Sequence, residues 1–165
     1  RYAGVCNYNV AQLKEADQTL KIISNQIPFS MVNRAVENEI VPYCIEKNKS
    51  VLAYSPMERG LLTGKITKDY KFEEGDHRQK NPFFKPESIE KTNALLAKIK
   101  PLADEKNASL SQLVLRWTIE QPGITIALVG ARNAKQSIQN AEAIKVKLTA
   151  DEIKFIDFEM KNAGF

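Results

Sequence analysis

A short apolar run that passes directly into a glycine-containing turn constrains this chain more than any other stretch. Residues Val51 to Tyr54 have the length and residue types of a buried β-strand. Pro56 ends that strand because its ring fixes φ and removes an amide hydrogen. Gly60 and Gly64 then permit turns that side chains would exclude. A buried strand that opens into such a loop is typical of α/β proteins, which bind ligands at the carboxyl ends of their strands.

The same alternation of strand and helix continues along the chain. Strands are predicted over residues 2–6, 22–27, 51–55 and 124–129, and helices over 10–20, 37–47, 88–106, 109–120, 133–144 and from 149 onward. Strands separated by helices imply parallel pairing with right-handed crossovers. Four such βα units are half of an eight-stranded (β/α)8 TIM barrel, here with extra helices. We therefore expect an α/β fold with one domain over residues 1–165.

Capping residues and apolar spacing predict the helix starts and their buried faces. Asn9, Ser109, Asn133 and Thr149 are the expected N-caps. The side chains expected on buried helix faces are Leu13, Ala16, Leu20, Ile40, Val41, Cys44, Ile45, Leu95, Leu96, Ile99, Leu113, Leu115, Trp117, Ile119, Ile153, Ile156 and Phe158. Residues 66–87 lack periodicity and are expected to form a long loop, in which His77 is a solvated residue rather than a catalytic one.

Composition excludes several classes of protein. The net charge is +4 and acidic residues are mixed among the basic ones, which indicates a solvated surface rather than a nucleic-acid groove. The two cysteines, Cys6 and Cys44, have no paired spacing and no nearby histidine, so we expect neither a metal site nor a disulfide framework. Free cysteines fit a reducing, cytoplasmic compartment. No apolar run approaches the roughly 20 residues of a membrane helix, and no signal peptide is visible.

Four landmarks, one at each strand end, resemble the C-terminal half of an aldo-keto reductase. They are Gly4-Val5-Cys6-Asn7, Asn25-Gln26, Ala53-Tyr54-Ser55-Pro56-Met57 with Gly60-Leu61-Leu62-Thr63-Gly64-Lys65, and Val129-Gly130-Ala131-Arg132 with Gln136 and Asn140. Their order and spacing match the family over nearly the whole chain, which would make the four strands the fifth to eighth of a barrel. The chain also opens at Arg1 without Met, and we expect it to be the later part of a longer protein.

The resemblance implies a site for NADP (as NADPH). Asn7 and Gln26 would hold the nicotinamide carboxamide, with Cys6 where the family usually has Ser, and Tyr54 would stack on the nicotinamide ring. The pyrophosphate would lie against Ser55, Met57, Gly60 and Leu61, the adenosine phosphate against Gly130 and Arg132, and the adenine against Gln136 and Asn140. Apart from the resemblance, the residues themselves indicate an anion site, because Asn133 opens a helix whose amino end attracts anions. Arg132 beside it has a fork suited to phosphate.

The same resemblance places the family's catalytic Asp, Tyr, Lys and His before Arg1, so no catalytic residue is assigned to this chain. The whole enzyme would reduce an aldehyde or ketone by hydride transfer, while this chain alone is expected to be inactive. The alternative is a non-catalytic nucleotide-binding or scaffold module of the same fold. An open half-barrel would also leave two strand edges and an apolar face exposed. We therefore expect self-association or pairing with the missing N-terminal half, and no nucleic-acid or membrane partner.

Overall fold

The computed structural model describes residues 1–165, which divide into two compact units. The first comprises residues 1–56 and 118–130, and the second comprises 57–117 and 131–165. Each unit is described by itself below. The prediction of a single domain over the chain stays a prediction.

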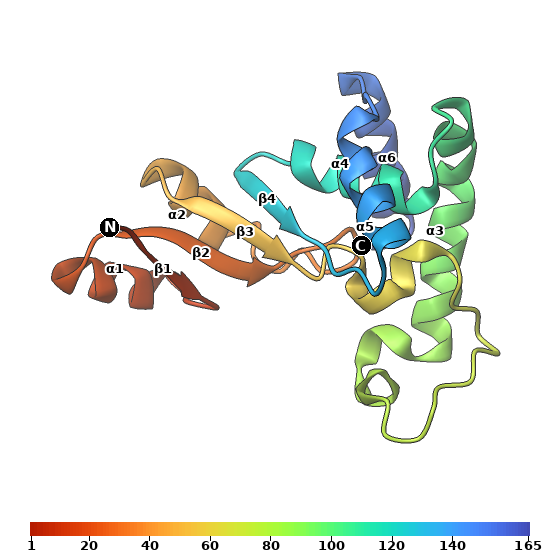
Figure 1. Cartoon of the computed structure of the whole chain (residues 1–165), viewed down its shortest axis with the longest axis horizontal. Helices are drawn as coiled ribbons and strands as arrows, with labels where there is room; N and C mark the ends of the chain where they lie inside the picture. The colour runs from red at the N-terminus through yellow and green to blue at the C-terminus, as the bar shows by residue number, and fades with distance from the viewer. The chain divides into compact units, whose positions relative to one another are not determined.

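The first unit is a parallel sheet of four strands, β1 (Ala3–Cys6), β2 (Ile22–Pro28), β3 (Ser50–Tyr54) and β4 (Ile124–Leu128), in the order β1-β2-β3-β4 (Figure 1). Helices α1 (Val10–Thr19) and α2 (Ile40–Glu46) connect the first three strands. The predicted strands and their parallel pairing are confirmed. Because all four strands run the same way, their carboxyl ends lie along one edge of the sheet.

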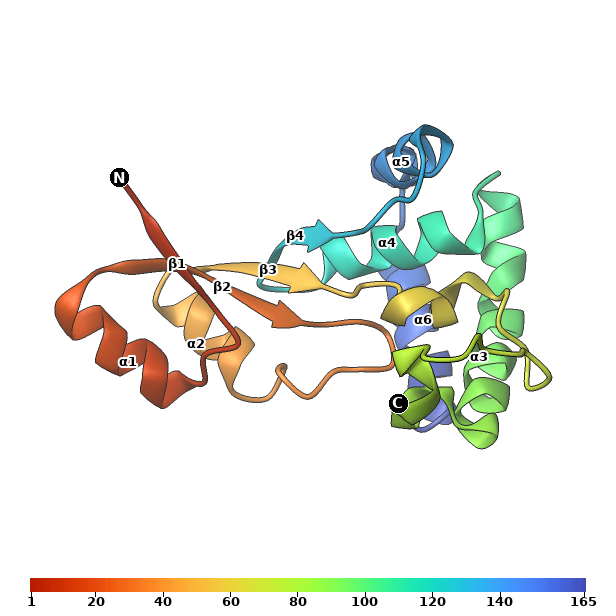
Figure 2. The same ribbon diagram turned by 60° about the horizontal axis from the view of Figure 1, so that its bottom comes forward.

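The two faces of this sheet differ in burial. Helices α1 and α2 lie on the same face, as right-handed crossovers require (Figure 2). On that face Asn25, Val51 and Ala53 are fully buried. The other face, called here the open face, carries Cys6, Gln26, Leu52, Tyr54, Ile126 and Leu128, as the strand register and the alternation of side chains place them. Ile126 is 47% exposed and Leu128 is 36% exposed, so apolar side chains on the open face meet solvent.

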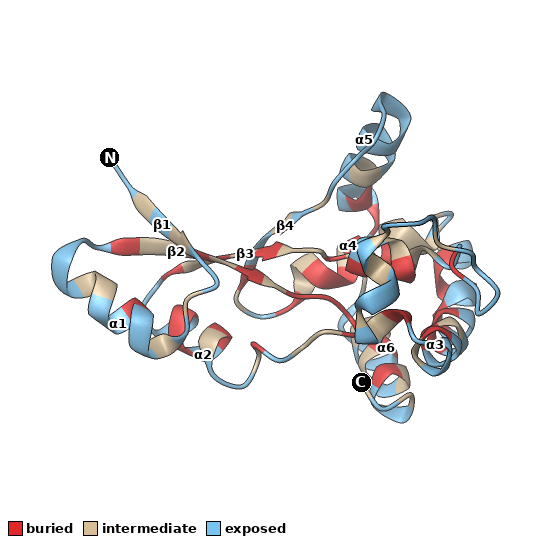
Figure 3. Ribbon diagram, turned by 90° about the horizontal axis from the view of Figure 1, so that it is seen from below, coloured by how far each residue is buried: buried red, intermediate tan, exposed pale blue.

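The second unit is helical. It contains α3 (Pro86–Glu105), α4 (Leu110–Glu120, whose last three residues belong to the first unit), α5 (Ala134–Ala141), α6 (Ala150–Asn162) and the short 3₁₀ helices η1 (Glu58–Thr63), η2 (His77–Lys80), η3 (Pro82–Phe84) and η4 (Glu142–Lys145). Trp117 is fully buried and donates its indole N–H to Asp157 Oδ1 at 2.9 Å, which confirms that it belongs to the core. Helix α5 has no buried residue and is largely exposed in Figure 3.

Local sequence signals located the helix starts well. The side chains of Asn9, Asn133 and Thr149 each accept a hydrogen bond from the backbone N–H three residues on. Ser109 does the same for Gln112 at 3.2 Å. These bonds satisfy amide groups that a helix start leaves without partners. All four predicted N-caps are therefore confirmed.

Three predicted core side chains are exposed instead. Leu20 is 57% exposed because α1 ends at Thr19 and the helical phase no longer applies. Ile45 is 54% exposed at the rim of a surface pocket, while its neighbour Cys44 is buried as predicted. Phe158 is 59% exposed, since two residues after Ile156 it lies on the opposite side of α6. Of the other expected core residues, Ala16, Ile40, Ile119 and Ile153 are only partly buried.

The residues 66–87, predicted as a loop, contain only η2, η3 and the first two residues of α3. His77 is exposed there, as predicted. None of the helices combines the length and the apolar composition that a membrane span requires.

Candidate functional site

The strand ends bring three of the predicted site residues to one face of the sheet. Cys6 and Gln26 are register partners on β1 and β2, and Gln26 is paired in turn with Leu52 on β3. Tyr54 lies two residues beyond Leu52 and therefore points to the same side. All three side chains lie on the open face, near the carboxyl ends of their strands. A flat ligand on this face would meet a thiol, an amide and an aromatic ring.

Asn7 joins this group through its backbone conformation. Its φ is +60°, a left-handed value that asparagine tolerates better than most residues. Its amide N–H donates to Gln26 O at 2.8 Å, which fixes the end of β1 against β2. The hydroxyl of Tyr54 donates to Asn7 Oδ1 at 3.2 Å. The structure thus brings Asn7 to Tyr54 by a side-chain bond and to Gln26 by a backbone bond.

Asn25 supports this arrangement and was not among the predicted site residues. It is fully buried, its Nδ2 donates to Tyr8 O at 2.8 Å, and its Oδ1 accepts from Tyr8 N at 3.4 Å. These bonds anchor the turn after Asn7. Sequence reasoning placed Asn25 in a landmark, but a buried amide that holds a distant backbone segment leaves no periodic signal of its own.

Ser55 and Gly130 follow the ends of β3 and β4. Ser55 has a φ of +55°, which turns the chain sharply out of the strand. A Cβ added at Gly130 would meet no heavy atom within 4 Å, and the residue is exposed. The backbone at Gly130 is therefore open to close approach by a ligand.

In the second unit, the residues Met57–Leu61 form a turn, called here the phosphate turn after the pyrophosphate that the sequence resemblance predicts for it. Glu58, Arg59 and Gly60 have successive positive φ values of 40°, 53° and 96°. Met57 O accepts from Gly60 N at 3.0 Å and from Leu62 N at 3.2 Å. Leu61 is fully buried as a whole residue, so among the predicted site residues of the turn only Met57 and Gly60 have exposed surface. The left-handed conformation of Glu58 and Arg59 was missed, because nothing in those residue types indicates it.

The start of α5 carries the remaining predicted residues of the second unit. Gln136 Oε1 accepts from Arg132 N at 2.8 Å, and Asn133 Oδ1 accepts from Gln136 N at 2.9 Å. These bonds fix the helix start and leave the exposed Arg132 side chain beside it. Asn140 lies one turn beyond Gln136 and is partly buried. The Gln136 side chain is thus hydrogen-bonded to the backbone of Arg132.

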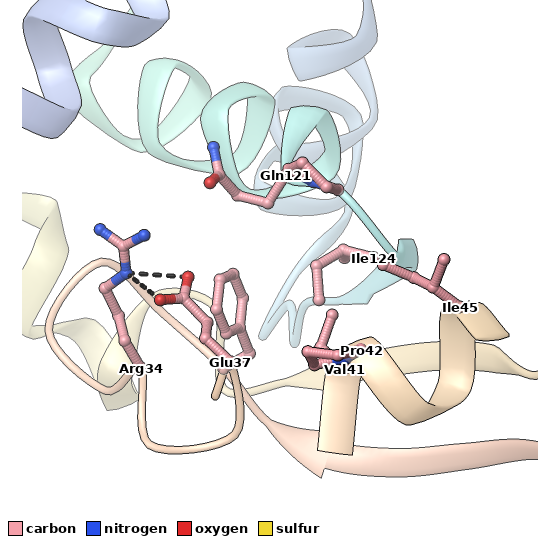
Figure 4. A pocket seen from close by; sticks show the side chains of 9 residues that line it. Arg34, Glu37, Val41, Pro42, Ile45, Gln121 and Ile124 are labelled. Atoms are coloured by element: carbon pink, nitrogen blue, oxygen red, sulfur yellow. Dashed lines mark hydrogen bonds and ion pairs between the residues drawn. The ribbon is translucent and has the colours of Figure 1, made fainter. Parts of the chain in front are cut away.

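A pocket of about 240 Å³ in the first unit lies elsewhere (Figure 4). Its lining includes Val41 and Pro42 of α2 together with Gln121, and an ion pair of 2.8 Å between Arg34 and Glu37 lies at its side. None of the predicted site residues lines this pocket. Its position gives no support for assigning it the dinucleotide. No group of three or more His, Cys, Asp or Glu side chains in the chain is arranged to hold a metal ion.

The model of the aldo/keto reductase family matches residues 1–158. The chain belongs to the aldo/keto reductase family. Among its relatives is an NADH-specific methylglyoxal reductase of Escherichia coli, 32% identical over 149 residues, which are 90% of this chain and 45% of the relative. The NADP(+) aldo-keto reductase yakc of Schizosaccharomyces pombe is 30% identical over 166 residues, 99% of this chain and 49% of the relative.

The fold of the family is also found in solved structures. A glycerol dehydrogenase from Gluconobacter oxydans superposes with a TM-score of 0.88 at 31% identity, covering 99% of this chain and 50% of that protein. The chain therefore spans about half the length of the aldo-keto reductases that it matches. Its four-stranded parallel sheet is consistent with half of such a barrel.

Proposed function

We propose that this chain is the NADPH-binding, C-terminal half of an aldo-keto reductase that reduces aldehydes or ketones. The observation that carries the proposal is the gathering of Asn7, Gln26 and Tyr54 at the carboxyl edge of one parallel sheet. An aromatic face flanked by two amide side chains fits the nicotinamide ring and its carboxamide. The bound cofactor would supply the hydride, and the chain would supply orientation.

Each part of the dinucleotide has a group of residues suited to it. In the first unit, Cys6, Asn7, Gln26 and Tyr54 would receive the nicotinamide end, Ser55 would contact the pyrophosphate, and Gly130 would allow close backbone approach to the adenosine phosphate. In the second unit, Met57, Gly60 and Leu61 would hold the pyrophosphate, Arg132 the adenosine phosphate, and Gln136 and Asn140 the adenine. Backbone amides and an arginine fork are the groups that proteins use for phosphate.

The cofactor assignment is tested by titrating the chain with NADPH and NADH in a calorimeter. Arg132 is expected to favour NADPH, because the extra phosphate of that cofactor is a partner for its guanidinium. In Arg132→Met the preference is expected to shrink by about tenfold, the loss of one charged hydrogen bond. Lys147, also exposed but outside the proposed site, provides the matched control, Lys147→Met. An unchanged preference of Arg132→Met for NADPH over NADH would count against this role.

We further propose that the chain alone does not catalyse carbonyl reduction, since no residue in it corresponds to the family's proton donor. An assay with NADPH and a panel of aldehydes tests this, and robust turnover would contradict it. The second candidate is a nucleotide-binding module without catalysis. Its discriminating observation is made on this chain paired with an N-terminal half-barrel: NADPH binding without turnover there supports the module, and turnover supports the reductase.

The open face suggests what the chain associates with. Strands β1 and β4 are the two edges of the sheet, and Ile126 and Leu128 expose apolar surface beside one of them. Parallel sheets are normally covered on both faces. We propose pairing with an N-terminal half-barrel or self-association through these edges. Light scattering at high concentration is the measurement, with Ile126→Lys expected to weaken association; a stable monomer would argue against it.

The state of the two cysteines supports a proposal on the compartment. Cys6 is exposed, Cys44 is fully buried, and both are free thiols. We propose a cytoplasmic location, where thiols stay reduced. Fractionation of the source cells with an antibody to the chain provides the test.

A further inference from the structure

A single guanidinium organises the long loop of the second unit. The centre of the Arg78 guanidinium lies 5.8 Å from the ring of Tyr70, 5.2 Å from that of Phe72 and 6.0 Å from that of Phe84. Phe72 also makes edge-on contacts with the other two rings, at centroid distances of 4.9 and 5.8 Å. Three aromatic side chains from different parts of the loop thus gather around one cation.

Asp76 holds that cation in a fixed orientation. Arg78 Nε lies 3.0 Å from both Asp76 oxygens, and Nη2 lies 2.6 Å from Oδ2. Asp76 also caps η2 by accepting from the backbone N–H of Arg78 at 2.9 Å. The two side chains are only 17% and 14% exposed. A mostly buried pair of this geometry defines where the rest of the guanidinium points.

The remaining arm of the guanidinium reaches the phosphate turn. Arg78 Nη1 donates to Arg59 O at 3.4 Å, a long hydrogen bond across 19 residues of sequence. Arg59 is one of two consecutive non-glycine residues in the turn with positive φ. Such conformations are strained for residues that carry a Cβ, and they persist only where surrounding contacts hold them.

We propose that Arg78 is a positioning residue that holds the phosphate turn Met57–Leu61 in its left-handed conformation before a pyrophosphate binds. The inference rests on the proposed function, because it takes that turn as the pyrophosphate site. Arg78 acts through the Arg59 carbonyl and through the aromatic cluster of the loop. Its role is geometric, so a lysine in its place does not fulfil it: an ammonium lacks the planar fork that contacts Asp76 and Arg59 together.

The binding test compares ligands with and without a pyrophosphate. Arg78→Met is expected to weaken NADPH about tenfold, since a charged hydrogen bond and the packing around it are lost. The NADPH affinity of Arg78→Lys is expected to lie within about twofold of that of Arg78→Met. Adenosine 2′-phosphate, which lacks the pyrophosphate, is expected to bind all variants equally. Lys80→Met removes the same charge from an exposed site in η2 and is expected to bind NADPH like the unaltered chain.

A second readout needs no ligand. Hydrogen exchange of the Gly60 and Leu62 amides, which both donate to Met57 O, reports whether the turn is held. Exchange is expected to be about tenfold faster in Arg78→Met and unchanged in Lys80→Met. If Arg78→Met does not fold, Asp76→Asn breaks the same ion pair while keeping a side chain that can cap η2.

The outcomes separate the two proposals. If the unaltered chain does not bind NADPH, the proposed function fails, and exchange alone decides the role of Arg78. Unchanged exchange at Gly60 and Leu62 in Arg78→Met overturns the inference. The inference is also overturned if Arg78→Met binds NADPH within twofold of the unaltered chain, or if Arg78→Lys fully restores the NADPH affinity. Selective loss of NADPH affinity together with faster exchange supports it.

Discussion

The hydroxyl of Tyr54 donates to Oδ1 of Asn7 at 3.2 Å, and this hydrogen bond spans strand β2, which lies between the strands that carry the two residues. The bond ties together the ends of β1 and β3. It also fixes the tilt of an aromatic ring on the open face of the sheet. Under the proposed function this ring would stack on one face of the nicotinamide and would decide the side from which hydride leaves.

The first prediction concerns the ring and the hydroxyl of Tyr54 separately. Tyr54→Phe keeps the stacking surface and loses one hydrogen bond, so NADPH affinity is expected to fall about threefold. Tyr54→Ala loses the ring as well, so its NADPH affinity is expected to fall more than tenfold. Fluorescence titration with NADPH is the measurement, and Tyr2→Phe, at a side chain that is 81% exposed, is the control. Wild-type affinity in Tyr54→Ala would remove Tyr54 from the site.

The two cysteines are expected to differ in reactivity. Cys6 is exposed, whereas Cys44 is fully buried and burial raises the pKa of its thiol. A disulfide reagent such as DTNB is therefore expected to titrate one thiol per folded chain quickly, and both in urea.

The same site gives a prediction on affinity. Cys6→Ser is expected to abolish the fast reaction with DTNB. It is also expected to raise the NADPH affinity about threefold, because a hydroxyl is a stronger hydrogen-bond partner than a thiol. Fast labelling of the Cys6→Ser chain under native conditions would show that Cys44 is accessible. Unchanged or weaker NADPH binding would show that this side chain makes no contact with the carboxamide.

Two glycines provide a matched test of backbone strain and crowding. Gly123 and Gly75 have nearly equal φ values of 84° and 82°. A Cβ at Gly123 would lie 2.7 Å from Val41 Cγ1 and 2.9 Å from Ile45, whereas one at Gly75 would meet nothing within 4 Å. Gly75→Ala is expected to destabilise by about 1 kcal/mol through strain alone. Gly123→Ala adds overpacking of about 1–3 kcal/mol.

Urea unfolding measures the change in unfolding free energy caused by each substitution. The difference between the two changes reports the cost of crowding at Gly123. Equal losses of stability in Gly75→Ala and Gly123→Ala would mean that α2 yields to the added methyl group without cost.

The ion pair of Asp76 and Arg78 predicts a dependence of stability on acid. The side-chain hydrogen bonds from Arg78 lower the pKa of Asp76 from 3.8 to about 2. Because the folded-state pKa lies below the unfolded one, the stabilisation is complete above about pH 4 and is lost as the pH falls towards 2. The difference in unfolding free energy between the unaltered chain and Asp76→Asn should be constant from pH 7 to 5.

Below pH 4 that difference should shrink, and urea titrations at pH 7, 5, 3 and 2 measure it. Other carboxyl groups with lowered pKa values, such as Asp17 and Glu152, titrate in both proteins and cancel in the comparison. A difference that stays constant down to pH 2 would contradict the lowered pKa of Asp76.

Local sequence signals predicted the elements of this chain more reliably than their packing. The N-caps at Asn9 and Thr149 were identified because capping depends on residues three apart. The burial of Ile45 and Phe158 was predicted wrongly, because apolar character alone does not say which side of a helix finds a partner. Met160, which is fully buried four residues after Ile156, completes the true apolar face of α6.

The candidate site shows the same division. Its residues were predicted from the landmarks at the strand ends, and the register confirms that Cys6, Gln26 and Tyr54 share a face. The supporting contacts were not predicted. Asn25 holding the Tyr8 backbone and Arg78 holding the Arg59 carbonyl join residues 17 and 19 positions apart. No periodic pattern encodes contacts of that range.

Side-chain periodicity and residues within one helical turn of each other were enough to locate the strands and helices. Motifs at the strand ends were enough to indicate the family. The left-handed conformation of Glu58 and Arg59, the bond from Tyr54 to Asn7 and the aromatic cluster around Arg78 became visible only in the folded chain. Each of these depends on which distant groups the folded chain brings within reach, and that is a property of packing rather than of local propensity.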